Sequence, residues 1–300
     1  MSKIKIASFN VNSVKARLSN VLAWLKNSQP DIVLLQEIKC LEKDFPFEAF
    51  FDAGYNAAVS GQKTYNGVAI LSKFKIEDVV KTLPKTSGSK YGAIIVKAKR
   101  AAKATDLFND ADAEELMDQA RYIEAVVSAH GQAIRIASIY VPNGGGEILP
   151  SQTLESSAKF LYKLEFFDRL NAHLEQLLAH DEIAVFGGDY NVAAEKIDVY
   201  DPKNLEGGVC FHPLERQKFR ALLNIGLTDS YRAFNQQNQA FTWWDYRGNS
   251  WQYNKGMRID YLLTSALATD KISAATIEDH GVRDQEKASD HCPACLTIEI

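Results

Sequence analysis

Apolar and polar residues alternate along several short segments of the chain, and this pattern is typical of β-strands with one buried face. Residues 4–9 alternate in this way, and residues 31–35 form a short β-branched run that predicts a buried strand. Further strands are predicted at residues 67–71, 93–96, 123–128, 134–141, 183–186, 241–245, 259–263 and 294–300.

Helices are predicted where apolar residues recur every three or four positions. After the first strand, Asn12 or Ser13 could cap a helix that ends before Pro30. The apolar face of this helix would consist of Val14, Leu18, Val21, Leu22 and Leu25. A long amphipathic helix is predicted over residues 154–179 and a shorter helix over residues 212–223.

The order of these elements bears on the fold class. Strands and helices do not alternate strictly, and several strand pairs are close enough in sequence to form hairpins. This order favours an α/β fold with mixed sheets over a purely parallel, doubly wound sheet. The chain has no internal repeat and no long linker rich in proline or serine, so we expect residues 1–300 to form a single domain.

Composition and charge are those of a soluble globular protein, with 300 residues, 46% of them apolar and 24% charged. The formal net charge is −4, whereas a protein that binds nucleic acid is more usually basic. This balance counts mildly against DNA but allows a local basic rim, since net charge says nothing about distribution. Candidates for such a rim are Lys39, Lys90, Arg121, Lys255, Arg258 and Arg283, although ordinary surface charge explains any one of them equally well.

The expected compartment follows from features that the sequence lacks. It begins without an apolar signal core and contains no run of ~20 apolar residues such as a membrane span needs. Its four cysteines are too few for a disulfide scaffold of this size, and Cys292 and Cys295 have redox-like spacing without a second pair. We expect buried thiols, a cytoplasmic location and a monomer. Residues 106–118 carry six acidic residues and no basic one, which predicts a solvated helical surface excursion.

Polar residues suited to metal or phosphate chemistry follow the apolar part of several predicted strands. They occur in Phe9-Asn10-Val11-Asn12, Leu35-Gln36-Glu37, Phe186-Gly187-Gly188-Asp189-Tyr190-Asn191, Arg258-Ile259-Asp260-Tyr261 and Ser289-Asp290-His291. Each alone could be a helix cap, a surface carboxylate or a hydrogen-bonded turn. Together they supply a complementary set, and in open α/β sheets ligands bind outside strand ends. We therefore expect these termini to converge on one cleft.

The residue types match what phosphodiester hydrolysis requires. A hard divalent cation neutralises phosphate charge, and Mg²⁺ typically takes one or two carboxylates, for which Glu37 and Asp290 are suited with Asn10 beside them. A carboxylate such as Asp189 next to Asn191 can activate and aim water. Charge that develops on phosphoryl oxygens needs donors, and these could be supplied by His291, Tyr140 or an asparagine, with Asp260 orienting His291.

The whole chain resembles the exonuclease III family of abasic-site endonucleases, within the endonuclease/exonuclease/phosphatase superfamily. Seven motifs in register carry the resemblance: Ser8-Phe9-Asn10-Val11-Asn12, Leu35-Gln36-Glu37-Ile38-Lys39, Tyr140-Val141-Pro142-Asn143-Gly144, Gly187-Gly188-Asp189-Tyr190-Asn191-Val192, Phe241-Thr242-Trp243-Trp244-Asp245-Tyr246-Arg247, Arg258-Ile259-Asp260-Tyr261 and Ser289-Asp290-His291.

The resemblance implies a four-layered α/β sandwich, with two mixed β-sheets packed face to face and helices outside. It implies Mg²⁺ dependence, with Mn²⁺ as a substitute, and incision of duplex DNA 5′ to abasic sites with 3′→5′ exonuclease or 3′-phosphodiesterase activity. By matching motifs, the metal would be held by Glu37, and the same site would be lined by Asn10, Asp189, Asn191, Asp290 and His291. Tyr140 and Asn143 would reach the phosphate, and Asp260 would pair with His291.

Three further positions concern the DNA itself. By resemblance Trp243 would form a wall of the pocket for a flipped-out abasic sugar, and Arg247 is a candidate phosphate contact. Met257 departs from the tryptophan common in the family, and it keeps this position apolar but more adaptable, which bears on substrate discrimination. Two alternatives stay open: a relative that acts on phospholipid or inositol phosphates, and a binding scaffold without catalysis.

Overall fold

The computed structural model describes residues 2–84, 119–145, 153 and 157–300. It contains two six-stranded sheets and a separate two-stranded ribbon. The first sheet has the order β13 (Ile272–Ile277), β14 (Ala294–Glu299), β1 (Lys3–Asn10), β2 (Ile32–Gln36), β4 (Val68–Ser72) and β3 (Asn56–Ser60). The second has the order β5 (Lys75–Val80), β6 (Tyr122–Ala129), β7 (Gln132–Tyr140), β8 (Ala184–Asp189), β12 (Asp260–Thr264) and β9 (Thr228–Asp229). The ribbon pairs β10 (Trp243–Trp244) with β11 (Gly256–Met257).

Both large sheets are mixed. β1 runs parallel to β2 and β7 runs parallel to β8, whereas the other pairs in the two sheets are antiparallel. The two-residue connection between β6 and β7 forms an antiparallel hairpin, whereas crossovers that contain α1 (Leu18–Ser28) and α5 (Ala158–Leu178) join the parallel pairs. The mixed sheets predicted from the order of elements are confirmed.

The two sheets pack face to face through alternate strand residues. Ile6 and Leu34 point from the first sheet into a shared core with Ile136 and Val185 of the second. Their neighbours face the opposite side, as the two-residue period of a strand requires. Gly187 permits this close packing, because a Cβ there would lie 2.4 Å from Leu34 Cδ1.

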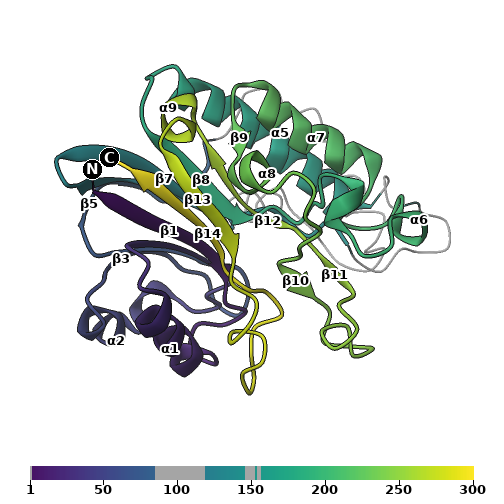
Figure 1. The fold of residues 1–300 in the computed structure, drawn as a ribbon, viewed down its shortest axis with the longest axis horizontal. Helices are drawn as coiled ribbons and strands as arrows, with labels where there is room; N and C mark the ends of the chain where they lie inside the picture. Colours follow the sequence, from purple (N-terminus) through teal and green to yellow (C-terminus); the bar gives the residue numbers. More distant parts are fainter. Residues whose placement is uncertain (1, 85–118, 146–152, 154–156) are drawn as a thin grey trace, which may run out of the picture.

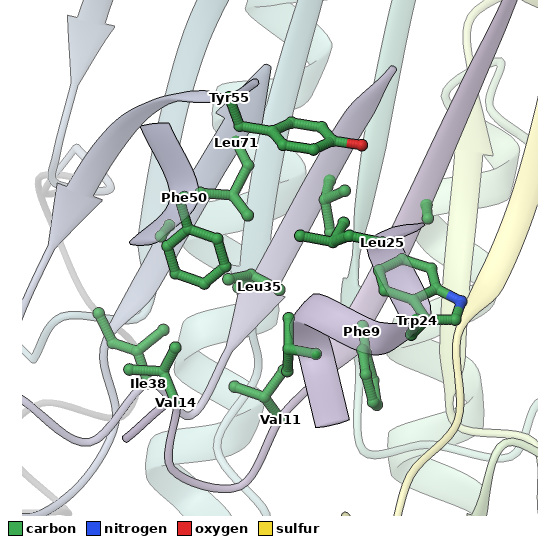
Figure 2. Close-up of a cluster of buried hydrophobic side chains, with 14 of the residues drawn as sticks. Phe9, Val11, Val14, Trp24, Leu25, Leu35, Ile38, Phe50, Tyr55 and Leu71 are labelled. Carbon is green, nitrogen blue, oxygen red and sulfur yellow. The ribbon is translucent and has the colours of Figure 1, made fainter. Parts of the chain in front are cut away.

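Helices cover the two outer faces and complete four layers, as Figure 1 shows. On the first sheet, α1 and α2 (Phe47–Asp52) bury Trp24 and Phe50 against β1 and β2 (Figure 2). On the second sheet, α5 and α7 (Pro213–Asn224) bury Phe167 and Phe219. The predicted four-layered α/β sandwich is confirmed.

The remaining described elements are short. They are the 3₁₀ helices η1 (Glu42–Asp44) and η3 (Lys196–Asp198), and the helices α6 (Pro202–Leu205), α8 (Ser230–Phe234) and α9 (Ala266–Thr269). The β10–β11 ribbon and the segment before β14 extend from the same end of the sandwich (Figure 1). None of the helices in the described ranges combines the length and apolar character of a membrane span.

Several predicted boundaries differ from the structure. The prediction that a helix starts at Asn12 or Ser13 is wrong: α1 begins at Leu18, and both residues have positive φ, which an α-helix excludes. Only two residues of the strand predicted at 241–245 are in a strand. β3, β5 and β13 were not predicted, since their exposed or half-buried residues give a weak pattern. The predicted strand 93–96, the acidic segment 106–118 and Lys90 lie outside the described residues.

Candidate active site

Strand ends from both sheets meet at one edge of the sandwich. β1 ends at Asn10, β7 at Tyr140 and β8 at Asp189, while β12 runs antiparallel to β8 and begins at Asp260. In the sheet register, Asp189 is paired with Tyr140 on one side and with Asp260 on the other. The predicted convergence of polar strand ends is therefore present, and it brings the two sheets together at one cleft.

A buried amide joins the carboxylates of the two sheets. Asn10 Nδ2 donates to Glu37 Oε1 at 3.0 Å and to Asp189 Oδ2 at 2.9 Å, and the side chain of Asn10 is inaccessible to solvent. One amide nitrogen therefore links the carboxylate of Glu37 to that of Asp189.

His291 lies against two aspartates. Its Nδ1 is 2.9 Å from Asp260 Oδ2, and its Nε2 is 3.8 Å from Asp189 Oδ2. Burial lowers the pKa of His291, but the charges of Asp260 and Asp189 outweigh it and raise the pKa to about 10. Burial raises the pKa of Asp189 to about 7, against the opposing charge of His291. A protonated imidazole therefore stands beside a carboxyl group whose pKa is near neutrality, as acid–base catalysis requires.

Two asparagines hold Asp189 from the other side. Asn191 has φ 52°, and this left-handed backbone allows its N–H to donate to Asp189 Oδ1 at 2.8 Å. Its amide nitrogen donates to Val141 O at 2.9 Å, and Asn143 Nδ2 donates to Asn191 Oδ1 at 3.0 Å. These contacts fix the direction of the Asp189 carboxyl group.

Tyr140 reaches Glu37 across the cleft, and its hydroxyl donates to Glu37 Oε1 at 2.9 Å. Burial and the nearby Glu37 carboxylate raise the pKa of Tyr140 well above its usual value, so the phenol keeps its proton. The guanidinium of Arg121 lies 4.6 Å from the ring centroid of Tyr140. Tyr140 is thus a neutral hydrogen-bond donor at the edge of the cleft.

One ligand atom from each of Glu37, Asp189 and His291 lies within 4.8 Å of the others, a spacing that suits a metal ion. Both ring nitrogens of a protonated imidazole are donors, so the carboxylates of Glu37 and Asp189 would hold the ion and His291 would lie beside it. Burial raises the pKa of Glu37, but the charge and hydrogen bond of Lys39, 2.7 Å away, act together with Asn10 and His291 to keep this pKa below its usual value. The carboxylate oxygens and the adjacent amides are ligands that suit a hard divalent cation. The chemistry of the residues present therefore fits such an ion.

Asp290 lines the same cleft from a different position. Its Oδ1 accepts from Asn12 Nδ2 at 2.9 Å, and its Oδ2 accepts from Trp243 Nε1 at 3.0 Å. Asp290 is not one of the three residues whose ligand atoms cluster, and its assignment to the metal stays a prediction. Asn12, which the sequence suggested as a helix cap, instead orients Asp290.

The cleft has a volume of about 360 Å³, and its lining residues are Glu37, Tyr140, Asn143, Asp189, Asn191, Val209, Cys210, Trp243, Met257, Ile259, Asp290 and His291. One wall is acidic and amidic, whereas Trp243 and Met257 form part of an apolar wall. Val209 and Cys210 were missed from the sequence because nothing in their local pattern distinguishes them from other apolar residues.

Some expected DNA contacts lie elsewhere. Arg247 does not line the cleft: its side chain is 90% exposed and pairs with Asp245 at 2.8 Å. Arg258 and Arg283 are buried, and the prediction that they belong to a basic rim is wrong. Arg258 pairs with Asp198 and Asp229, and Arg283 donates to Ser289 O, so both support the structure from within.

Such an arrangement defines a class of enzymes in which a carboxylate–imidazole pair beside a cation site acts on a phosphate group. The chain belongs to the endonuclease/exonuclease/phosphatase family, whose model matches residues 7–291. It is 30% identical to exodeoxyribonuclease III from Haemophilus influenzae, with 97% of this chain and 98% of that protein aligned. The resemblance to the exonuclease III family is confirmed.

Solved structures agree with this assignment. An AP endonuclease from Archaeoglobus fulgidus superposes with a TM-score of 0.80 at 30% identity and covers 99% of this chain and 100% of its own. The 3′ phosphatase NExo from Neisseria, bound to a product DNA hairpin, gives a TM-score of 0.80 at 32% identity, with 99% and 100% covered. The similarity therefore extends over both sheets and all the segments that form the cleft.

Proposed function

We propose that this protein is a DNA-repair phosphodiesterase that hydrolyses the DNA backbone. The observation that carries the proposal is the buried array of Asp260, His291 and Asp189 next to Glu37, in a cleft with an apolar wall. Relatives named exodeoxyribonuclease III, AP endonuclease and 3′ phosphatase support the choice of DNA as substrate.

The finer assignment is incision 5′ to abasic sites in duplex DNA, with 3′→5′ exonuclease or 3′-phosphodiesterase activity at 3′ ends. Trp243 and Met257 support it, because an apolar wall of this kind suits a sugar that has lost its base. We propose that residues 1–300 act as one catalytic domain, as a cytoplasmic monomer, with Mg²⁺ as the cation and Mn²⁺ as a substitute.

A divalent cation bound by Glu37, with Asn10, Asp189, Asn191, Asp290 and His291 around it, would neutralise phosphate charge and stabilise the leaving oxygen. Carboxylate and amide oxygens in this set are the ligands that Mg²⁺ prefers.

The side chains around the cation site divide the remaining work. Asp189, held by its hydrogen bonds with Asn191, accepts a proton from the attacking water. His291, kept protonated by Asp260, donates toward a phosphoryl oxygen. Tyr140 and Asn143 also donate to the phosphate. Arg247 contacts a phosphate further along the duplex, where its exposed side chain can leave Asp245.

The test is nicking of a duplex that carries one abasic-site analogue, measured beside phosphate release from an inositol phosphate. We expect nicking that EDTA abolishes and that Asp189→Asn reduces by about 10²–10⁴-fold. Asp181→Asn, at an exposed position with φ 53°, is the matched control and should nick at the wild-type rate.

Three outcomes would count against the proposal. Release of phosphate from the inositol phosphate without nicking would assign the enzyme to another substrate class. Nicking that persists in EDTA would refute the metal-dependent mechanism. Binding of DNA without cleavage of any tested duplex would indicate a scaffold rather than an enzyme.

A further inference from the structure

Lys163, on the first turns of α5, is a fully buried cation that lies behind the cleft. Its side chain is 0% exposed. Its ammonium donates to Asn143 O at 3.0 Å, to Asn191 O at 2.7 Å and to Glu215 Oε1 at 2.5 Å. An ammonium has three donors, and each of them has a partner here.

Two of these partners belong to the loops that supply the amides of the cleft. Asn143 lies on the loop after β7 and Asn191 on the turn after β8, and their side chains are joined by the 3.0 Å hydrogen bond from Asn143 Nδ2 to Asn191 Oδ1. The turn also positions Asp189, through the 2.8 Å bond from Asn191 N. Lys163 therefore holds the backbone of both loops through two carbonyls, and these loops present the side chains of Asn143 and Asn191 to the cleft.

The surroundings are shaped to admit this lysine. Gly144 has φ 80°, and a Cβ there would lie 2.8 Å from Lys163 Cδ, so a side chain at position 144 would displace the lysine. Glu215 is also 0% exposed, and its second oxygen accepts from His212 N at 3.1 Å to cap α7. The carboxylate of Glu215 is thus held in place by its position in the first turn of α7.

Stability alone does not account for this arrangement. Replacing a buried ion pair by uncharged side chains of similar volume is often neutral or stabilising, because taking two charges out of water is costly. The ammonium of Lys163 has a second role here, because it donates to two carbonyls and a carboxylate at once, whereas an apolar side chain could donate to none of them.

We infer that Lys163 is a positioning residue for phosphodiester hydrolysis, acting through the carbonyls of Asn143 and Asn191. This inference rests on the proposed function. Lys163 does not touch the cleft itself, because it is absent from the residues that line it. Its loss should therefore reduce turnover more than substrate binding.

The experiment compares Lys163→Met/Glu215→Gln with Glu215→Gln alone. The double variant removes both charges together and keeps an acceptor for His212 N, so that no unpaired charge is buried. E215Q keeps the lysine and both of its carbonyl contacts. We expect kcat on the abasic duplex to fall about 10²-fold in K163M/E215Q, with KM close to wild type, since a displacement of about 1 Å can cost this much. E215Q should be less stable than wild type, because the ammonium loses its counter-ion, but it should retain most of the wild-type kcat.

A control variant removes another, half-buried ion pair. Lys5 Nζ lies 2.7 Å from Glu278 Oε1, and neither residue lines the cleft. We expect K5M/E278Q to keep its kcat even where its thermal midpoint falls. Amide hydrogen exchange gives a readout without catalysis: the N–H groups of Val141 and Asn191 should exchange faster in K163M/E215Q and unchanged in K5M/E278Q.

The outcomes separate the two proposals. If wild-type protein nicks no duplex, the proposed function fails, and exchange at Val141 and Asn191 still tests whether Lys163 holds the loops. If wild type nicks and folded K163M/E215Q has wild-type kcat, the positioning role is refuted. Should that variant not fold, Lys163→Leu/Glu215→Gln replaces the ammonium by a shorter apolar side chain that has no donor. A lowered kcat in this folded variant supports the inference, and a wild-type kcat overturns it.

Discussion

Replacing Asp260 by asparagine should change how the reaction depends on pH. Asp260 Oδ2 lies 2.9 Å from His291 Nδ1, and both side chains are buried. The second oxygen of Asp260 is buried without a hydrogen-bond partner among the described residues, so the charge of this carboxylate is directed at the imidazole. In Asp260→Asn an amide oxygen can still accept from Nδ1, which preserves the orientation of His291 while removing the charge.

The size of the effect follows from the distance. Two opposite charges ~3 Å apart at an effective dielectric of ~20 attract by roughly 5 kcal/mol, which corresponds to about 4 pH units. The pKa of His291 is raised to about 10 although burial lowers it, because Asp260 and then Asp189 stabilise the cation. Without the Asp260 charge, burial opposes only the charges of Asp189 and Asp290. The amide oxygen still accepts from Nδ1 and offsets about one of these ~4 pH units, so we expect the His291 pKa to fall to roughly 7.

The assay has two parts. NMR titration of His291 in EDTA, where the protein is free of metal, should show its pKa close to 10 in wild type and several units lower in D260N. The ratio of variant to wild-type turnover of the abasic duplex should then be about tenfold lower at pH 8 than at pH 6, because only about a tenth of the variant's imidazole would be protonated at pH 8. D181N should follow the wild-type profile.

The pH dependence of the free energy of unfolding should also differ between wild type and D260N. A raised pKa in the folded state stabilises the protein fully below the unfolded value of 6.5, and this contribution is lost as pH rises towards about 10. D260N should therefore lose most of the alkaline dependence of its unfolding free energy. A His291 pKa that stays near 10 in D260N, or a ratio of wild-type to variant turnover that is constant from pH 6 to 9, would refute the reasoning.

Three further predictions concern the metal, the apolar wall and acid stability. Glu37→Ala should raise the Mg²⁺ concentration needed for half-maximal activity by about tenfold or more, because the carboxylate suits the cation; an unchanged metal titration would contradict this role, and His291→Ala should instead depress turnover. Trp243→Ala should weaken incision at abasic sites more than removal of 3′ phosphates, since the wall would contact the baseless sugar; equal losses on the two duplexes would argue against a sugar pocket. In Glu278→Gln the free energy of unfolding should decrease less between pH 7 and pH 3 than it does in wild type. Burial raises the pKa of Glu278, but Lys5 and its other hydrogen-bond partners outweigh burial and lower this pKa, so the stabilisation by Glu278 is present above the unfolded pKa and lost as pH falls. A series of urea-unfolding measurements in which the variant's free energy of unfolding falls with pH as steeply as that of wild type would show that Glu278 does not contribute.

Local patterns were enough to predict most of the strands and the identity of the polar strand ends. Residues 4–9 and 31–35 alternate or cluster by side-chain type, and this depends only on neighbours along the chain. Boundaries that depend on backbone conformation were less accessible. Asn12 and Ser13 have the composition of a helix cap, but both have positive φ in the fold, where Ser13 N donates to Glu37 O and Asn12 Nδ2 donates to Asp290 Oδ1.

The sequence by itself determined which chemical groups were available: the carboxylates of Glu37, Asp189 and Asp260, the imidazole of His291, and amides beside them. The tertiary structure decided which of these groups share protons and charge. The bridge from Asn10 to both Glu37 and Asp189 spans the two sheets, and the ammonium of Lys163 ties α5 to two loops. Such contacts arise from strand order, register and packing between sheets, which join residues far apart in the chain and leave no periodic pattern at either end. For the same reason Arg258 and Arg283 look like surface cations in the sequence and are buried supports in the fold.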